Sequence, residues 1–185
     1  MSASRPWVTQ VVLFLAGAVG GTLGDQIHVQ FRVLSYPAPW LLGQAAWVPP
    51  LFGAAALVLV NGQRVFLPRQ LTEPRPGAAR VARTVALFYL AYLSTGLLQD
   101  SPRLLALALC GWWAARVALK PSRDRVLSSL ASAVGGCLFE GALSSTGAFA
   151  YRAPDVIGVP LWLGPLYLHV ALMTRAIYLA AVARD

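Results

Sequence analysis

Long apolar runs separated by short polar breaks dominate the 185-residue chain. Each run is close to the roughly 20 residues that a helix needs to cross the hydrocarbon core of a bilayer. The runs lack the alternation of apolar and polar residues that a transmembrane barrel requires. The pattern predicts an all-α, polytopic membrane bundle of six transmembrane helices that forms one domain, residues 1–185. The expected spans are residues 7–24, 40–61, 81–99, 103–119, 126–147 and 157–181.

The first apolar run, residues 7–24, is predicted to be a retained helix. It has no basic stretch before it beyond Arg5, and further apolar runs come after it, which does not fit a cleaved signal peptide. Small residues in this run allow close helix approach, either inside the protein or between copies in a homo-oligomer. They are Gly17, Gly20, Gly21 and Gly24.

Basic residues concentrate in alternate breaks between the runs. The two basic breaks hold Arg64, Arg69, Arg75 and Arg80, and then Arg116, Lys120, Arg123 and Arg125. The other breaks each carry one arginine with an acidic residue nearby. Because basic loops stay on the cytosolic side of a membrane, we expect both termini to be cytosolic.

Composition supports a membrane location and leaves no room for a soluble catalytic head. Hydrophobic residues make up 57% of the chain and charged residues 12%, about half the usual charged share of a soluble domain. The net charge of +8 would suggest nucleic acid in a soluble protein. Here positive-inside loops and anionic headgroups explain it, so no nucleic-acid partner is expected. The arginine- and alanine-rich composition is typical of a bacterial source, and we expect a bacterial inner membrane, or the endoplasmic reticulum if the source is eukaryotic.

Two adjacent prolines, Pro49 and Pro50, interrupt the run at 40–61. They remove two backbone donors, so in mid-span they should kink or break the helix. Two interpretations stay open at this point. The kink serves packing alone, or it forms the wall of an internal cavity with Trp47 and Phe52 as apolar lining.

Glu140 lies inside the run at 126–147, where a charge is costly unless it is neutralised or partnered. By depth it lies in the outer half of the bilayer, with His169 nearer the middle. Asp25 and His28 lie at comparable depth, so these groups could form a hydrogen-bonded cluster. Glu140 then either locks helices together or contacts the head of a ligand.

Three functions are consistent with these features: a lipid-binding protein, a lipid-modifying enzyme that uses Glu140 and His169, and a small transporter. No catalytic spacing such as Gly-x-Ser-x-Gly or His-Glu-x-x-His is present. We find no internal repeat of the kind that many transporters carry. Cys110, Cys137 and the two histidines make no metal site, and no cofactor is implied. We therefore favour a structural role for Glu140, or contact with the head of a ligand, over catalysis.

Three segments in order resemble the Insig family of membrane proteins and its bacterial relatives. The stretch from Ala46 to Pro50 is similar to the family's Trp-Val-Pro-Pro segment. The Leu/Ala run that ends at Trp112 and Trp113 is similar to the family's run ending in a Trp pair. The segment from Gly147 to Asp155 resembles the family's Gly-x-x-x-Tyr-x-x-Pro-Asp turn.

The resemblance implies a non-enzymatic protein, here a bacterial homologue, that holds a lipid in a cavity between helices. Eukaryotic members bind oxysterols and retain the escort protein Scap, and bacterial relatives are associated with lipids such as diacylglycerol. The resemblance places ligand contacts at Gln99 and Trp112 and, across a gap in the alignment, at Phe88. Eukaryotic members need an acidic residue just after the Trp pair to bind Scap. This chain has Arg116 at the corresponding position, which argues against a Scap-type partner.

Taken together, the residues and the resemblance predict a sterol-like or diacylglycerol-like ligand, with a regulatory or sensor role. The candidate ligand-binding residues are Trp47, Pro50, Phe88, Gln99, Trp112, Glu140 and His169.

Overall fold

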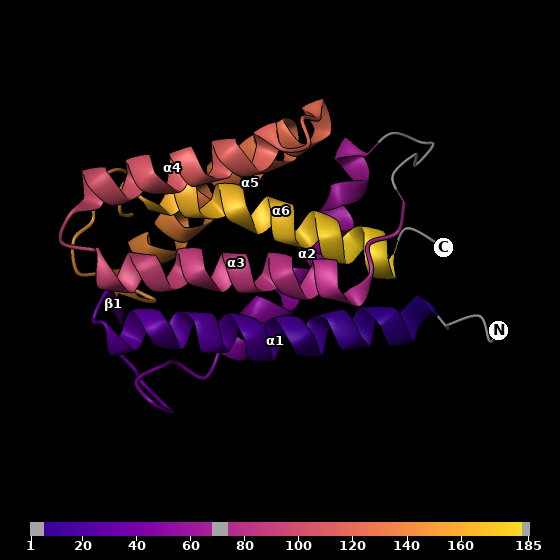
Figure 1. Ribbon diagram of the computed structural model, residues 1–185. Helices are drawn as coiled ribbons and strands as arrows, with labels where there is room; N and C mark the ends of the chain where they lie inside the picture. The colour runs from indigo at the N-terminus through magenta and orange to yellow at the C-terminus, as the bar shows by residue number, and fades with distance from the viewer. Residues whose placement is uncertain (1–5, 68–73, 183–185) are drawn as a thin grey trace.

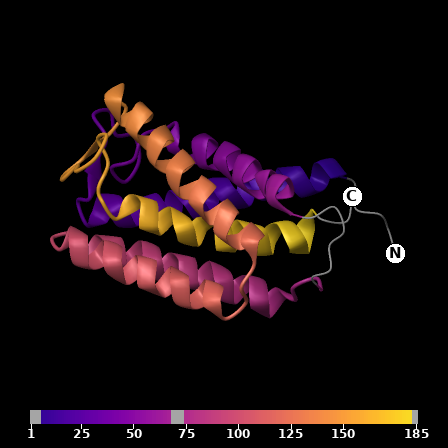
Figure 2. The same ribbon diagram turned by 90° about the horizontal axis from the view of Figure 1, so that it is seen from above.

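The computed structural model describes residues 6–67 and 74–182, which contain six α-helices and one short two-stranded antiparallel sheet. The helices pack side by side, and α1 begins at the same end of the bundle at which α6 ends (Figure 1). The view from above shows α5 crossing the bundle obliquely (Figure 2). The elements are α1 (Pro6–Gln30), β1 (Leu34–Ser35), α2 (Val48–Phe66), α3 (Ala78–Leu97), α4 (Pro102–Ala118), α5 (Arg123–Ser145), β2 (Ala150–Tyr151) and α6 (Leu163–Ala181).

The outer surface of the bundle is apolar, as a lipid-facing surface requires. Leu107 on α4 is 72% exposed and Val19 on α1 is 63% exposed. Within the described chain, three helical segments are long and apolar enough to cross a membrane by length and composition alone. They are Trp7–Gln30, Arg123–Ser145 and Leu163–Ala181.

The proline pair occupies the first turn of α2, so the predicted kink in mid-helix is wrong. The chain before Val48 forms a turn, and α2 covers Val48–Phe66 instead of the expected 40–61. At the start of a helix the missing proline N–H has no intrahelical partner to lose, and the fixed φ angle suits the first turn. Pro49 and Pro50 therefore start this helix and do not break it.

The segments that lead into α2 and α6 have the same backbone course. Each contains a tight turn in which two successive residues adopt positive φ angles. These are Leu42 (φ 51°) with Gly43 (φ 84°), and Ile157 (φ 48°) with Gly158 (φ 80°). The left-handed region is costly for a branched side chain, so its recurrence before both helices indicates a shared local structure.

The two segments also match in sequence, at a constant separation of 115 residues. Identical pairs include Tyr36 and Tyr151, Pro39 and Pro154, Gly43 and Gly158, Trp47 and Trp162, and Pro50 and Pro165. This corrects the expectation that the chain lacks an internal repeat. The identical positions are few, and a match of one apolar residue with another means little in a chain this apolar. The shared backbone conformation is therefore what makes the repeat evident.

The sheet lies on the pseudo-two-fold axis of this repeat. Ser35 in β1 pairs with Ala150 in β2, which is its own equivalent in the second repeat. By the same relation α1 corresponds to α5 and α2 to α6, while α3 and α4 lie outside the repeat. The axis therefore relates the packing of α1 on α2 to the packing of α5 on α6.

The third helix fills one of two equivalent grooves. It packs against both α1 and α6 and lies between them in Figure 1. Its Ala91 and Thr95 are fully buried there. The equivalent groove, between α2 and α5, receives none of the helices in residues 6–67 and 74–182. That groove contains the candidate site.

Candidate functional site

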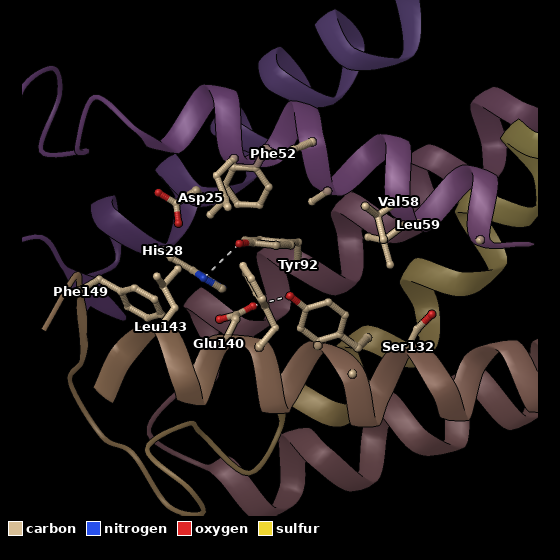
Figure 3. A pocket seen from close by; sticks show the side chains of 18 of the residues that line it. Asp25, His28, Phe52, Val58, Leu59, Tyr92, Ser132, Glu140, Leu143 and Phe149 are labelled. Atoms are coloured by element: carbon tan, nitrogen blue, oxygen red, sulfur yellow. Dashed lines mark hydrogen bonds between the residues drawn. The ribbon is translucent and has the colours of Figure 1, made fainter. Parts of the chain in front are cut away.

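A cavity of about 480 Å³ lies mainly between α2 and α5 (Figure 3). Small residues on both helices leave the space between them unfilled, and most of the remaining lining is apolar. The small residues include Ala54, Ala55 and Gly62 on α2, and Ala131, Gly135 and Gly136 on α5. Polar side chains gather at one end, where Figure 3 shows Asp25, His28, Tyr92 and Glu140. The other end is marked by Val58, Leu59 and Ser132.

Asp25 is the first of two carboxyl groups in the lining, and it is only 3% exposed. Its Oδ2 atom accepts a hydrogen bond from the Tyr36 hydroxyl (2.8 Å) and another from Gln44 Nε2 (2.7 Å). Burial, and the charge of Asp25 beside it, raise the pKa of the Tyr36 hydroxyl above its usual value. Tyr36 therefore keeps its proton and acts as the donor.

Glu140 is the second carboxyl group, and tyrosines hold it too. Its Oε2 atom accepts a hydrogen bond from the Tyr151 hydroxyl, and its Oε1 atom accepts one from Tyr167 (2.5 Å). Burial and the Glu140 carboxyl raise the pKa of the Tyr151 hydroxyl, so this phenol is also the donor. The Asp25–Tyr36 and Glu140–Tyr151 pairs have the same separation of 11 residues and occupy equivalent positions in the repeat.

In each repeat, a glycine on the first helix allows an aromatic ring of the second helix to pack directly against its backbone. A Cβ atom on Gly21 would overlap the Phe52 ring, and one on Gly136 would lie 2.5 Å from the Tyr167 ring. Phe52 and Tyr167 are equivalent positions, so the rings pack in the same way. The Tyr167 hydroxyl gives Glu140 a second phenol donor, whereas Asp25 receives its second donor from Gln44.

His28 joins the polar end to α3. The hydroxyl of Thr95 donates to the carbonyl oxygen of Tyr92 (2.6 Å), so its oxygen must accept from His28 Nε2 (2.7 Å). The other ring nitrogen, Nδ1, then accepts from the Tyr92 hydroxyl (3.2 Å). These contacts assign a neutral imidazole with its proton on Nε2. The His28 ring also stacks on Tyr92, with ring centroids 4.3 Å apart.

The structure places two of the seven predicted ligand-binding residues, Trp47 and Glu140, in the lining of this cavity. Pro50 lies in the first turn of α2 and is outside the described lining. Phe88 packs edge-on against Tyr92, with centroids 5.7 Å apart, and supports a lining residue without lining the cavity itself.

The other three lie elsewhere among the described residues. Gln99 donates to the carbonyl oxygen of Phe31 (2.7 Å) at the end of α3. His169 donates from Nε2 to the carbonyl oxygen of Leu109 (3.0 Å), and its Nδ1 accepts from Arg116 (2.8 Å).

The Trp112 and His169 rings are 5.0 Å apart. This cluster belongs to α4 and α6, so His169 does not meet Glu140. The pairing on which the enzyme alternative depended is therefore not formed. Contact of any of the seven residues with a ligand remains a prediction.

Sequence reasoning placed Asp25 and His28 only in a loose cluster, and it missed the tyrosines that organise the site. Tyr36, Tyr151 and Tyr167 are the donors to the two carboxyl groups. The signal that could have found them is the equal spacing of an acidic residue and a tyrosine before each tight turn. Among the described residues, no group of three His, Cys, Asp or Glu side chains could hold a metal ion.

Comparison with known proteins identifies the family. No protein-family model matches the chain. An INSIG protein homolog from Mycolicibacterium vanbaalenii is 33% identical over 183 residues, which is 94% of this chain and 87% of that protein. The chain belongs to the Insig family. The chicken Insulin-induced gene 1 protein is 30% identical over 165 residues, or 83% of this chain and 64% of the chicken protein.

Solved structures of a mycobacterial Insig homolog, MvINS, have the same fold. The crystal structure of MvINS and that of its cross-linked trimer each superimpose with a TM-score of 0.84. Sequence identity in both superpositions is 28%, and they cover 99% of this chain and 98% of MvINS. These comparisons confirm the predicted family and the predicted all-α membrane bundle of six helices.

Proposed function

We propose that this Insig-family protein is non-enzymatic and binds a lipid in the cavity between α2 and α5. The observation that supports the proposal is a long, mostly apolar lining with both carboxyl groups and His28 gathered at one end. A volume of about 480 Å³ is within the range of small-molecule sites, which are mostly apolar with a few oriented polar groups. Lipids with a single small head and an apolar body match that arrangement.

The ligand class that we propose is sterol-like or diacylglycerol-like, because both present one hydroxyl group on a large apolar body. The hydroxyl would lie among Asp25, Tyr92 and Glu140, and the body would lie along α2 and α5. A sensor role follows if an occupied cavity holds these two helices apart and an empty one lets them approach.

Several features favour lipid binding over catalysis. Asp25 and Glu140 are each held by two internal donors, and His28 is fixed by Thr95 and Tyr92. His169, the proposed partner of Glu140 in an enzyme, lies in a separate cluster with Arg116. A general acid or base needs a proton that it can exchange with a substrate, and these groups are held in structural contacts.

Assembly and location are part of the same proposal. The mycobacterial homolog has been crystallised as a cross-linked trimer, and we propose a homo-oligomer for this chain too. The basic breaks support cytosolic termini, and the composition supports a bacterial inner membrane. Arg116 is bound by His169 where eukaryotic members carry an acidic residue, so a Scap-type partner is not part of the proposal.

The test is native mass spectrometry of purified protein with a variant that fills the cavity. Ala55→Trp places an indole in the lining, and Ala16→Trp places the same indole on the exposed surface of α1 as a matched control. The wild type and Ala16→Trp should carry a lipid adduct that Ala55→Trp loses. Equal adducts on both variants, or none on the wild type after mild extraction, would contradict the proposal.

A further inference from the structure

The two carboxyl groups of the cavity are equivalent by the internal repeat. Asp25 lies near the end of α1 and Glu140 holds the corresponding place on α5. Each accepts from the tyrosine 11 residues further along, and both face the same end of the cavity (Figure 3). The cavity is thus built around a matched pair of acceptors, one from each repeat.

The two side chains that donate to Asp25 have all their polar hydrogens in hydrogen bonds within the protein. The Tyr36 hydroxyl donates to Asp25, and the two N–H groups of Gln44 donate to Asp25 and to the carbonyl oxygen of Thr22 (2.9 Å). Since a phenol has one hydrogen and a primary amide has two, neither Tyr36 nor Gln44 has a hydrogen left to donate to a ligand.

The same count holds on the other side of the cavity. Tyr151 and Tyr167 both donate to Glu140. The Tyr92 hydroxyl donates to His28, whose own N–H is used on Thr95. These phenol oxygens therefore present only lone pairs to a ligand.

Nothing in the described lining offsets this excess of acceptors with positive charge. The lining residues include no lysine and no arginine among the parts of the chain that the structure describes. The other polar lining residues are neutral: Gln63 donates to Thr174 (3.0 Å), and Ser132 lies toward the far end of the cavity. A phosphate head, which carries negative charge and acceptor oxygens, would meet two carboxyl groups without a cation.

We infer that Asp25 and Glu140 select a lipid whose head donates hydrogen bonds, an alcohol or a primary amine, and reject a lipid with a phosphate head. The inference rests on the proposed lipid binding and names the chemistry of the head. A site built of buried acceptors discriminates strongly, because a ligand without donors leaves those acceptors unpaired.

The experiment uses three probes that share the same hexadecyl chain and differ only in the head group: hexadecanol, hexadecylamine and hexadecyl phosphate. Delipidated full-length protein in detergent receives an equimolar mixture at pH 7.4, and native mass spectrometry separates the adducts by mass. The alcohol and amine adducts should each exceed the phosphate adduct at least about tenfold. A phosphate adduct as abundant as the other two would overturn the inference.

Variants of Asp25 and Glu140 test whether these two carboxyl groups cause the preference among head groups. Asp25→Asn and Glu140→Gln keep the side-chain shape but replace a carboxyl oxygen by an NH₂ donor. In the double variant the ratio of phosphate adduct to alcohol adduct should rise about tenfold. Asp100→Asn, an acid-to-amide change at an exposed residue outside the cavity, should leave the ratio unchanged. An unchanged ratio in the double variant would contradict the assignment.

Failure of the inference can be told from failure of the proposed function. Adducts of all three probes in equal amounts would refute the head selection and leave lipid binding in place. Absence of every adduct on the wild type would refute lipid binding itself. The ranking on the wild type needs no variant, so a variant that fails to fold does not remove the test.

Discussion

The groove between α1 and α6 and the groove between α2 and α5 are related by the internal two-fold axis, yet one is filled and the other is hollow. The first receives α3, whose Ala91 and Thr95 are fully buried. The second is lined by small residues such as Ala55 and Gly135, and no helix of the described part of the chain occupies it. One backbone frame thus provides a packed core on one side and a cavity on the other. The helix that comes directly after the first repeat, α3, decides which side is filled.

The same substitution in the two grooves should have opposite consequences. Ala91→Leu adds three carbons to a fully buried position and should lower the free energy of unfolding by about 3 kcal/mol. Ala55→Leu should change it little, because the added carbons enter the cavity. Thermal unfolding in detergent compares the two variants. Equal loss of stability in both would mean that the α2/α5 groove is packed like its counterpart.

Equivalent glycines test the repeat itself. Gly21→Ala and Gly136→Ala each force a Cβ atom against an aromatic ring, that of Phe52 or of Tyr167. Each should lower the free energy of unfolding by about 2 kcal/mol through overpacking. Gly111→Ala on α4, where a Cβ would meet nothing within 4 Å, is the control. A loss at only one of the two equivalent positions would show that the repeats do not pack alike.

The hydrogen bonds that Tyr36 and Tyr151 donate to the two carboxyl groups should stabilise the protein by about the same free energy. Tyr36→Phe and Tyr151→Phe each remove one hydrogen bond and leave each carboxyl its other donor, Gln44 or Tyr167. We expect each to lower the free energy of unfolding by about 1 kcal/mol. Chemical denaturation of the two variants, in parallel with the wild type, measures this. A large asymmetry would contradict the equivalence of the two acceptors.

The smallest effect is expected outside the repeat-related contacts. Arg152 and Asp100 form an ion pair in which both side chains are substantially exposed. Asp100→Asn should change the free energy of unfolding by less than about 0.5 kcal/mol, because exposed pairs are weak and screened by salt. A loss comparable to that of Tyr151→Phe would show that this loop contact matters as much as the buried ones.

The sequence predicted the helices and the family but only part of the site, and the reason is physical. Apolar runs reveal membrane helices because the bilayer demands length and hydrophobicity. They do not reveal which side of a helix faces a cavity, since lipid-facing and core-facing residues are equally apolar. Depth arguments therefore grouped Glu140 with His169, which lie in different clusters. Trp47 was a candidate ligand-binding residue and lines the cavity, but the kink that suggested a cavity wall does not exist.

The internal repeat is a second feature that the sequence alone did not reveal. Tyr36 and Tyr151 are each separated by 11 residues from the acid that they contact, but this spacing becomes a signal only when the two segments are aligned with each other. The left-handed turns at Gly43 and Gly158 make the equivalence evident once the backbone is known. Backbone conformation of this kind follows from tertiary packing as well as from local sequence, so it could not be inferred from composition.

Anomalous diffraction from crystals grown with a long-chain alcohol brominated at the end of its chain tests the central claim most directly. We predict a bromine peak between α2 and α5, near Val58 and Ser132, at the end of the cavity opposite the two carboxyl groups. Bromine only on the outer surface of the bundle, or beside Trp112 and His169, would contradict lipid binding in this cavity.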